Sequence, residues 1–181
     1  MIKLSSLKDK CRQRPGAVLG GGPSLPDDMA RLPENCLLIA VNYHALYHCK
    51  PHYMVYWDNP EHDPAGLMPG FMETFQGIKV SPHESSDVAL DIPHWSGNYS
   101  SCFATWLALH LGCDPVILCG MDCYTSERVY CHDYSHDVPV FSYPLDGHLR
   151  PWYEECRNSV PHPERIRVMS GPISQIFPSY L

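Results

Sequence analysis

Three consecutive glycines after a short apolar run are the first residues whose type and spacing suggest chemistry. Residues 16–20 predict a buried strand, which continues into the motif GGGPSL. Glycines let backbone N–H groups approach an anion closely, and the N-terminus of a following helix adds a favourable dipole. The motif matches neither a Walker A loop nor the GxGxxG pattern. We expect Gly21, Gly22 and Ser24 to bind a nucleotide, or the loop to be a tight turn without a ligand.

A second candidate loop, WSGNYSS at residues 95–101, opens the helix that we expect at 96–111. Its hydroxyl and N–H groups would gather at a helix N-terminus, where anions bind well. Ser96, Gly97 and Asn98 are therefore candidate substrate-binding residues. The alternative is a plain helix cap, in which Ser96 or Asn98 satisfies the first turn.

Polar residues also follow three other predicted strands. These residues are Asn42, Asp58, Asn59 and Asp122, after strands at 36–41, 53–57 and 115–120. In an open α/β sheet, ligands bind beyond the carboxyl ends of the strands, so we expect all of these residues at one edge. Trp57 and Trp95 flank that edge, where either ring stacks on a base or packs in the core.

Continuous apolar runs that alternate with helical segments predict a mostly parallel sheet covered by helices on both faces. The remaining elements expected are strands at 78–80 and 165–169, helices at 26–32 and 149–158, a helical turn at 44–49 and irregular chain at 61–76. Ser24 is the expected N-cap of the helix at 26–32. We predict one Rossmann-like α/β domain over 1–181, with a loop-rich lid at 123–148.

Composition excludes several classes of protein. The 181 residues carry 13 Lys and Arg against 20 Asp and Glu, a net charge of −7, so extensive nucleic-acid binding is not expected. No apolar run reaches the roughly 20 residues of a membrane span, and residues 1–14 do not resemble a secretory signal. Nine dispersed cysteines, an odd number, indicate free thiols in a reducing cytoplasm. The oligomeric state stays open.

The motifs taken together resemble those of two related groups of enzymes. The residues that carry the resemblance are GGGPSL, Val41-Asn42, Asp58-Asn59-Pro60 and SGNYSSCFATWLALHLGCDPVILCGMD. One group is the MptE-like 6-hydroxymethylpterin pyrophosphokinases (domain of unknown function 115). The other is the bacterial lipooligosaccharide sialyltransferases of glycosyltransferase family 42.

The sialyltransferase resemblance, our leading interpretation, implies a nucleotide-sugar donor and no required cofactor. It implies that Gly21, Gly22 and Ser24 face the donor phosphate and ribose, that Asn42 and Asn59 bind the nucleotide and its phosphate, and that Ser96 and Gly97 hold the donor sugar or base. It further implies that lid tyrosines stabilise the leaving phosphate and that a histidine is the general base. The candidates are Tyr124, Tyr130 and Tyr134 for the phosphate, and His148 for the base, with His132 and His136 as competitors.

The pyrophosphokinase resemblance implies ATP, Mg²⁺ and a small acceptor alcohol. Metal ions neutralise the charge in phosphoryl transfer, and Asp58, Asp122 and Asp133 are the carboxylates that could hold them. A third hypothesis is a non-catalytic nucleotide- or sugar-binding module.

A cluster of soft ligands near the lid raises a metal alternative. Cys119, Cys123, Cys131, His132 and His136 are enough for zinc, but their spacing matches no standard finger or ribbon. A nucleophilic pair of Cys123 or Cys131 with His136 is the other cysteine hypothesis, and nothing in the sequence marks a lowered thiol pKa. We therefore expect no metal site.

Overall fold

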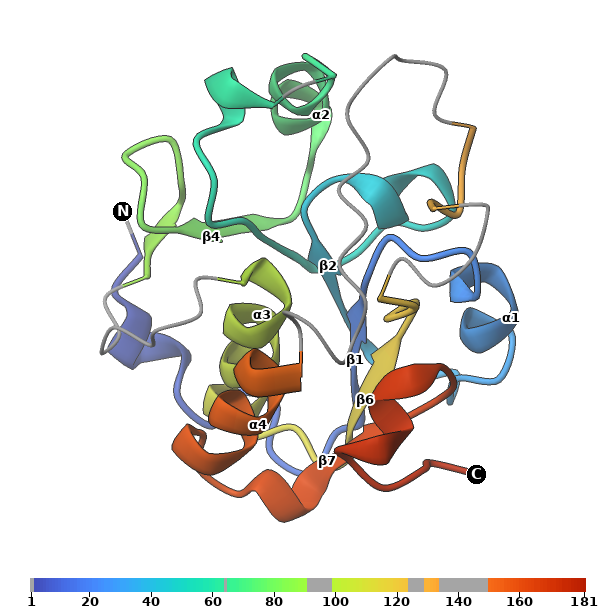
Figure 1. Ribbon diagram of the computed structural model, residues 1–181. Coiled ribbons are helices and arrows are strands. Elements are labelled where there is room, and N and C mark those ends of the chain that lie inside the picture. Colours follow the sequence, from blue (N-terminus) through green and yellow to red (C-terminus); the bar gives the residue numbers. More distant parts are fainter. Residues whose placement is uncertain (1, 64, 91–98, 124–128, 134–149) are drawn as a thin grey trace.

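A seven-stranded sheet, in which every strand pair is parallel, organises the chain (Figure 1). The computed structural model describes residues 2–63, 65–90, 99–123, 129–133 and 150–181. The strands are β1 (Gly16–Leu19), β2 (Leu37–Val41), β3 (Tyr53–Val55), β4 (Ile78–Ser81), β5 (Val88–Ala89), β6 (Val116–Cys119) and β7 (Ile166–Val168), in the order β5-β4-β3-β2-β1-β6-β7. The predicted α/β class is confirmed.

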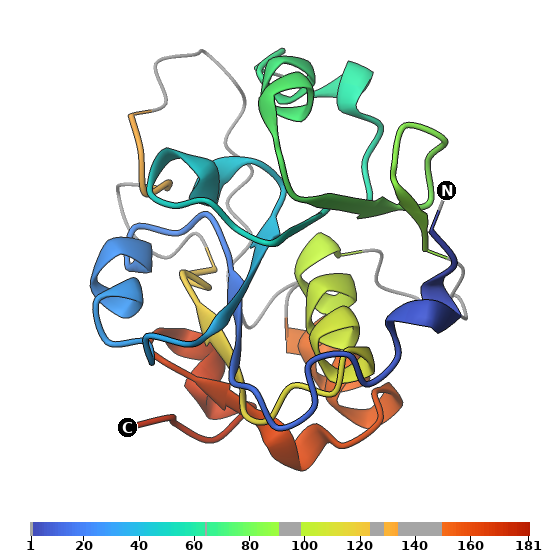
Figure 2. The ribbon, with the colours of Figure 1, turned by 180° about the vertical axis from the view of Figure 1, so that it is seen from behind.

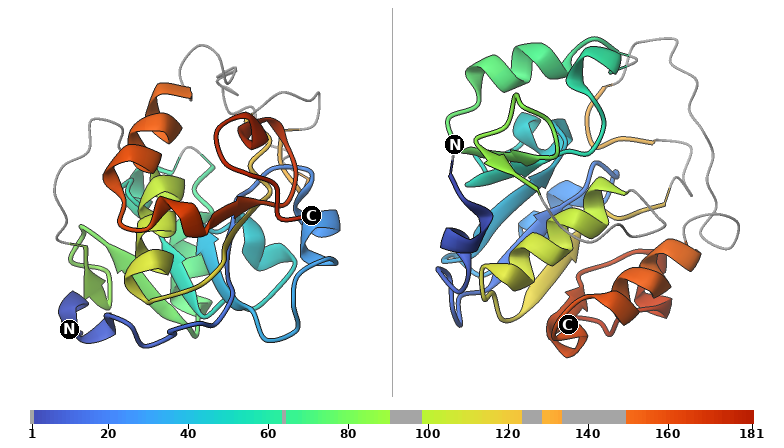
Figure 3. Two further views of the ribbon diagram at one scale, coloured as in Figure 1. Left: turned by 90° about the horizontal axis from the view of Figure 1, so that it is seen from below. Right: turned by 90° about the vertical axis from the view of Figure 1, so that its left-hand side faces the viewer.

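Helices cover both faces of the sheet (Figures 2 and 3). They are α1 (Leu25–Met29), α2 (Met68–Thr74), α3 (Ser100–His110) and α4 (Arg150–Ser159), with short 3-10 helices η1 (Leu4–Leu7), η2 (His44–Tyr47), η3 (Pro60–His62), η5 (Pro163–Arg165) and η6 (Pro172–Gln175). Side chains of α3, α4 and η6 form one buried cluster with the sheet. Side chains of α1, η2 and α2 form the cluster on the other face.

The continuous apolar runs in the sequence follow from burial on both faces. All four residues of β1 are buried, and Val18 lies in one cluster while its neighbours Ala17 and Leu19 lie in the other. A strand with only one buried face would instead alternate apolar and polar residues. The central strands β1, β2 and β6 are thus fixed in register by apolar packing from both sides.

The order of the strands reverses between β1 and β6. The chain proceeds from β1 outward to β5, then crosses back through α3 to β6 on the other side of β1. Loops that leave two such strands diverge to opposite sides, which opens a crevice at the carboxyl edge of the sheet. The glycine loop follows β1 and the segment Gly120–Asp122 follows β6, so both lie at this switch point.

Several predicted elements differ from those observed. Helix α2 lies within residues 61–76, which were expected to be irregular; Pro69 stands in its first turn and Met68 and Met72 bury one face. Strand β5 was not predicted, because two residues give no periodic signal. Helix α1 ends at Met29, well before the predicted end at residue 32. Of the predicted lid at 123–148, only residue 123 and residues 129–133 belong to the described part.

In the part of the chain that the structure describes, no helix has the length and apolar character needed to cross a membrane.

Candidate functional site

The glycine loop is packed directly against the end of β6. Gly20 N–H donates to Cys119 O at 2.8 Å, and Gly22 N–H donates to Gly120 O at 2.9 Å. A Cβ at Gly20 would overlap Gly120 O, and a Cβ at Gly22 would overlap Asp122 Oδ2. The glycines are therefore needed because two strand ends approach each other at backbone distance.

Most backbone amides of this loop are engaged inside the protein. Beyond the two bonds to β6, Ser24 N–H donates to Asp122 Oδ2 at 3.2 Å and Leu25 N–H donates to Gly22 O at 3.0 Å. The Gly21 N–H makes no hydrogen bond to the described residues. One backbone N–H of the loop thus remains available to bind a ligand, whereas the sequence suggested that several would be.

Ser24 joins two carboxylates instead of capping α1. Its Oγ lies 2.9 Å from Asp122 Oδ2 and 3.2 Å from Asp28 Oδ2, and it makes no capping bond to the helix backbone. The predicted cap therefore forms no cap bond, because the buried Asp28 and the half-buried Asp122 compete for the hydroxyl. The predicted site residues Gly22, Ser24 and Asp122 are brought together at the switch point.

Asn42, directly after β2, has two features of a binding residue. Its backbone is left-handed, with a φ of 55°, and its N–H donates to Val55 O at 2.9 Å. Its side-chain Oδ1 is buried and has no hydrogen-bond partner among the described residues. Strained backbone and unsatisfied buried polar groups both cost free energy and gather at functional sites. This carbonyl oxygen is the clearest vacant acceptor at the carboxyl edge.

Two of the residues after β3, Trp57 and Asn59, have structural roles. Trp57 stacks on Phe103 of α3 at 4.3 Å between ring centroids, and the backbone N–H of Trp57 donates to Ser100 Oγ. Asn59 Oδ1 accepts the Glu61 N–H at 3.1 Å and so caps η3. Asp58 is exposed at the same edge. Of the two roles expected for the Trp57 ring, stacking on a base or packing in the core, the structure shows packing.

Two histidines share a hydrogen bond beside the glycine loop. His44 Nδ1, at the start of η2, lies 2.9 Å from His132 Nε2, and His132 Nδ1 lies 3.2 Å from Asp133 O. A Cβ at Gly21 would approach the His44 ring to 2.8 Å. Tyr130 stacks on His44 at 4.3 Å. Because protein groups engage both ring nitrogens of His132, that ring is poorly arranged to take a proton from an acceptor hydroxyl.

The His44 imidazole makes a testable contribution to pH-dependent stability. Burial, and then the neighbouring His132, lowers the pKa of His44 from 6.5 to about 3. Between those pH values the unfolded chain binds a proton that the folded chain excludes. The contribution of His44 to the free energy of unfolding is therefore complete above pH 6.5. It decreases as the pH falls towards 3, with a slope of about 1.4 kcal/mol per pH unit.

Thermal unfolding followed between pH 7.5 and 4 tests this expectation. A His44→Phe variant should lose that part of the slope, whereas His62→Gln, which changes an exposed histidine, should keep it. Equal slopes in the wild type and His44→Phe would contradict the assignment.

The nine cysteines are free thiols. Burial raises the pKa of Cys119 strongly and that of Cys123 to about 12, which disfavours the thiolate that a nucleophile or a zinc ligand needs. Cys119 and Cys123 also belong to different buried clusters. No group of three or more potential metal ligands occurs among the residues whose placement is described.

The other sequence-predicted residues lie outside the described ranges and stay predictions. They are Ser96, Gly97 and Asn98 of the second loop, Trp95, and Tyr124, Tyr134, His136 and His148 of the lid.

Two features of the site were missed in the sequence. Asp28 is fully buried and accepts hydrogen bonds from Gly120, Ser170 and Arg31. The signal was an acidic residue one turn after Ser24, on the face of α1 that also buries Leu25. The His44–His132 hydrogen bond joins residues that are 88 positions apart in the sequence, and no local sequence pattern predicts such a contact.

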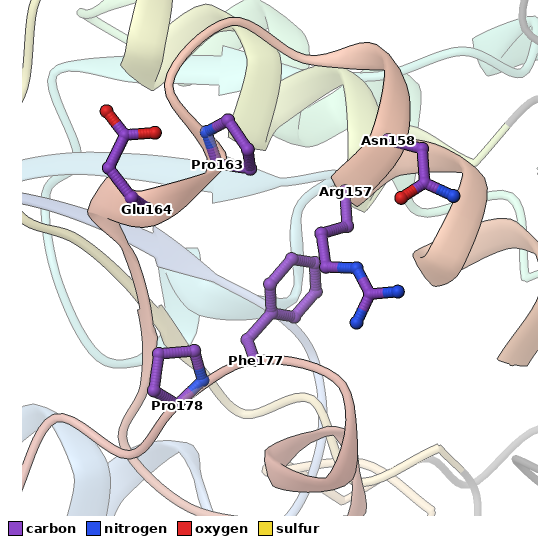
Figure 4. Close-up of a pocket in the computed structure, with 6 residues that line it drawn as sticks. All are labelled: Arg157, Asn158, Pro163, Glu164, Phe177 and Pro178. Carbon is purple, nitrogen blue, oxygen red and sulfur yellow. The ribbon is translucent and has the colours of Figure 1, made fainter.

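A surface pocket of about 470 Å³ lies elsewhere, at the β7 side of the sheet (Figure 4). Its lining residues are Arg157, Asn158, Pro163, Glu164, Phe177 and Pro178. Pro163 and Glu164 precede β7, so this pocket lies towards the amino ends of the strands. It does not adjoin the site at the carboxyl edge.

Comparison with solved structures finds the same fold in glycosyltransferases. The sialyltransferase CstII from Campylobacter jejuni, in complex with cytidine-5'-monophosphate, matches with a TM-score of 0.59 and 12% identity over 94% of this chain and 86% of that one. The monofunctional alpha-2,3-sialyltransferase Cst-I from Campylobacter jejuni matches with a TM-score of 0.59 and 13% identity over 93% and 81%. The MAf glycosyltransferase from Magnetospirillum magneticum AMB-1 matches with 0.58 and 15% over 93% of this chain and 35% of that one.

No family model matches the chain, and no curated protein matches it either. At 12–15% identity these similarities establish the fold, which is shared with glycosyltransferases that include sialyltransferases. The resemblance to MptE-like proteins stays a hypothesis.

Proposed function

We propose that this protein binds a nucleotide-sugar donor at the β1–β6 switch point and transfers its sugar to an acceptor hydroxyl. The observation that carries the proposal is Asn42, whose buried Oδ1 lacks a partner and whose backbone is held in a left-handed conformation. A nucleotide offers N–H and hydroxyl donors that would satisfy this oxygen once the half-buried side chain of Asn42 turns toward the bound ligand. The cost of leaving it unpaired in the free protein would then be recovered on binding.

The structural neighbours favour a cytidine nucleotide. CstII has been solved in complex with CMP, with CMP-3FNeuAc, and with a trisaccharide acceptor and CMP. In this chain a donor of this class would bind at the carboxyl edge of the sheet, where open α/β sheets bind their ligands. Gly21, with its unengaged N–H beside His44, and Asn42 are the described residues best arranged to meet it.

The reaction would be a displacement at the anomeric carbon of the donor sugar. The acceptor oxygen forms the new bond to that carbon, and the bond from the carbon to the phosphate oxygen breaks. The nucleoside monophosphate leaves with the electron pair. The acceptor proton passes to a base, for which His148 is our candidate, while Tyr124 and Tyr134 would hydrogen-bond to the departing phosphate.

Asp122 has a different role in this proposal from the one it would have as a metal ligand. Its Oδ2 accepts both the N–H and the Oγ–H of Ser24, so the carboxylate orients the glycine loop. A divalent cation would have to compete with these two donors. The pyrophosphokinase alternative, which requires Mg²⁺ on such carboxylates, is therefore the less favoured reaction.

Thermal unfolding with a panel of nucleotides tests the proposal. CMP, CDP, UDP, GDP, ATP and AMP are each added with Mg²⁺ or with EDTA. A ligand at about 100 times its Kd stabilises a protein by about 2.7 kcal/mol, which corresponds to a rise in Tm of roughly 5–10 °C for a chain of this size.

We expect CMP to raise Tm equally in Mg²⁺ and in EDTA. A rise with ATP that depends on Mg²⁺ would favour the pyrophosphokinase. CMP binding without release of CMP from a CMP-sugar would favour a binding module. No shift with any nucleotide would contradict the proposal.

A further inference from the structure

Asp28 is a buried carboxylate that cannot touch a ligand. Its exposed fraction is 0%, although it stands in the first turn of the short helix α1, directly after the glycine loop. Burying a carboxylate is costly unless hydrogen bonds replace the lost water. Asp28 meets this requirement with three donors, from Gly120, Ser170 and Arg31, and the identity of those donors shows what the residue holds together.

One oxygen of Asp28 joins the glycine loop to the end of β6. Asp28 Oδ2 accepts the Gly120 N–H at 2.9 Å and lies 3.2 Å from Ser24 Oγ. On its other side, Gly120 accepts the Gly22 N–H at 2.9 Å. Gly120 itself has a φ of 65°, and a Cβ there would approach Leu25 Cβ to 2.9 Å. The loop, the end of β6 and Asp28 thus form a closed ring of backbone and carboxylate contacts.

The other oxygen of Asp28 contacts a residue that follows β7 and a side chain at the protein surface. Asp28 Oδ1 accepts the Ser170 Oγ–H at 2.6 Å, two residues after the end of β7. It also accepts the Arg31 Nη2–H at 2.6 Å, from a side chain that is 41% exposed. The single carboxylate therefore ties the ends of β1, β6 and β7, and the Arg31 contact lies on the outside of that arrangement.

We infer that Asp28 is a positioning residue for the candidate site: it fixes the glycine loop against the ends of β6 and β7, and so sets the surface that a nucleotide meets. The inference rests on the proposed function, because the benefit of this rigid arrangement is nucleotide affinity. Residues that orient the direct ligands of a metal commonly change its affinity about 10–100-fold when they are removed, and we expect an effect of that order here.

The substitution Asp28→Asn alters this arrangement with little change of volume. An amide keeps one acceptor and replaces the other by an NH₂ donor. That donor must face either the Gly120 N–H or the Arg31 guanidinium, and neither can accept a hydrogen bond. In one orientation the bond to Gly120 is lost, and in the other it is weakened, because a neutral amide oxygen is a poorer acceptor than a carboxylate oxygen. Asp27→Asn is the matched control, because it removes the same charge from the same helix at an exposed position.

Arg31→Met separates positioning from stability. It removes the outer contact of Asp28 and leaves the bonds from Gly120 and Ser170 in place. We expect Arg31→Met to lower Tm by a few degrees with an unchanged Kd for CMP. We expect Asp28→Asn to lower Tm and also to raise the Kd for CMP roughly tenfold or more, measured by calorimetry well below Tm on fully folded protein. Asp27→Asn should change neither quantity appreciably.

Hydrogen exchange of the Gly120 amide gives a readout that needs no ligand. We expect exchange to accelerate in Asp28→Asn and to remain unchanged in Arg31→Met. An unchanged Kd in Asp28→Asn, or an equal rise in both variants, would overturn the inference. If the wild type bound no CMP, the proposed function would fail, and the exchange rates alone would decide whether Asp28 fixes the loop.

Discussion

Replacing Gly22 by alanine should abolish nucleotide binding and lower the free energy of unfolding by about 2–3 kcal/mol. The added Cβ would overlap Asp122 Oδ2 and would lie 2.7 Å from Gly120 O. Neither neighbour can yield easily, because Gly120 is backbone and the Asp122 carboxylate is held by Ser24. The loop would have to separate from the end of β6, at the point where we expect the nucleotide to bind.

Denaturant unfolding and calorimetric titration with CMP measure the two effects of Gly22→Ala. Gly70→Ala is the matched control, since Gly70 is an exposed residue of α2 and an added Cβ would meet nothing within 4 Å. Alanine in a helix is favoured over glycine by about 0.5–1 kcal/mol, so this control should gain stability and bind CMP normally. Wild-type stability in Gly22→Ala would contradict the described approach of the loop to β6.

Asn42→Gly should raise stability while it weakens nucleotide binding. Glycine adopts a positive φ without strain, and its lack of a side chain removes the unpaired Oδ1. The larger conformational freedom of glycine in the unfolded chain lowers stability and offsets part of these gains. We expect a net stabilisation of about 1 kcal/mol, and an increase in the Kd for CMP of roughly tenfold or more from the lost hydrogen bond.

Gln13→Gly is the control for the effect of the backbone alone. Gln13 also has a positive φ, of 63°, but it is exposed and precedes β1 at the amino edge of the sheet. This variant should gain stability for the same reason and leave CMP binding unchanged. A loss of stability in Asn42→Gly would show that Oδ1 makes a stabilising contact in the free protein, and normal CMP binding would remove Asn42 from the site.

Sequence patterns predicted the sheet well because burial on both faces leaves a strong signature. The runs that became β1, β2 and β6 are continuous and apolar, and glycine or a polar residue ends each of them. Helix α2 escaped prediction because Pro69 and Gly70 are usually signals of irregular chain. In α2 the proline stands in the first turn, where its missing N–H costs nothing, and packing of Met68 and Met72 supplies the rest.

The candidate site could be predicted only in part. Position at a strand end was enough to single out Gly22, Ser24, Asn42 and Asp122, since parallel strands deliver their carboxyl ends to one edge. The position of a residue in the sequence did not show which hydrogen-bond partner its polar group would have in the fold. Asn59 caps η3, and Asp122 holds Ser24. Asp28 was missed because its partners Gly120 and Ser170 are 92 and 142 residues away, so only the folded chain assembles them.

The central claim, a nucleotide site at the β1–β6 switch point, is tested most directly by NMR titration of the isotope-labelled wild type with CMP. Amide signals of Gly21 and Asn42 should shift and saturate together, while those of Arg157 and Asn158 at the distant pocket stay fixed. Saturable shifts at the carboxyl edge are the result that we predict. Shifts centred on Arg157 and Asn158, or none at millimolar CMP, would contradict it.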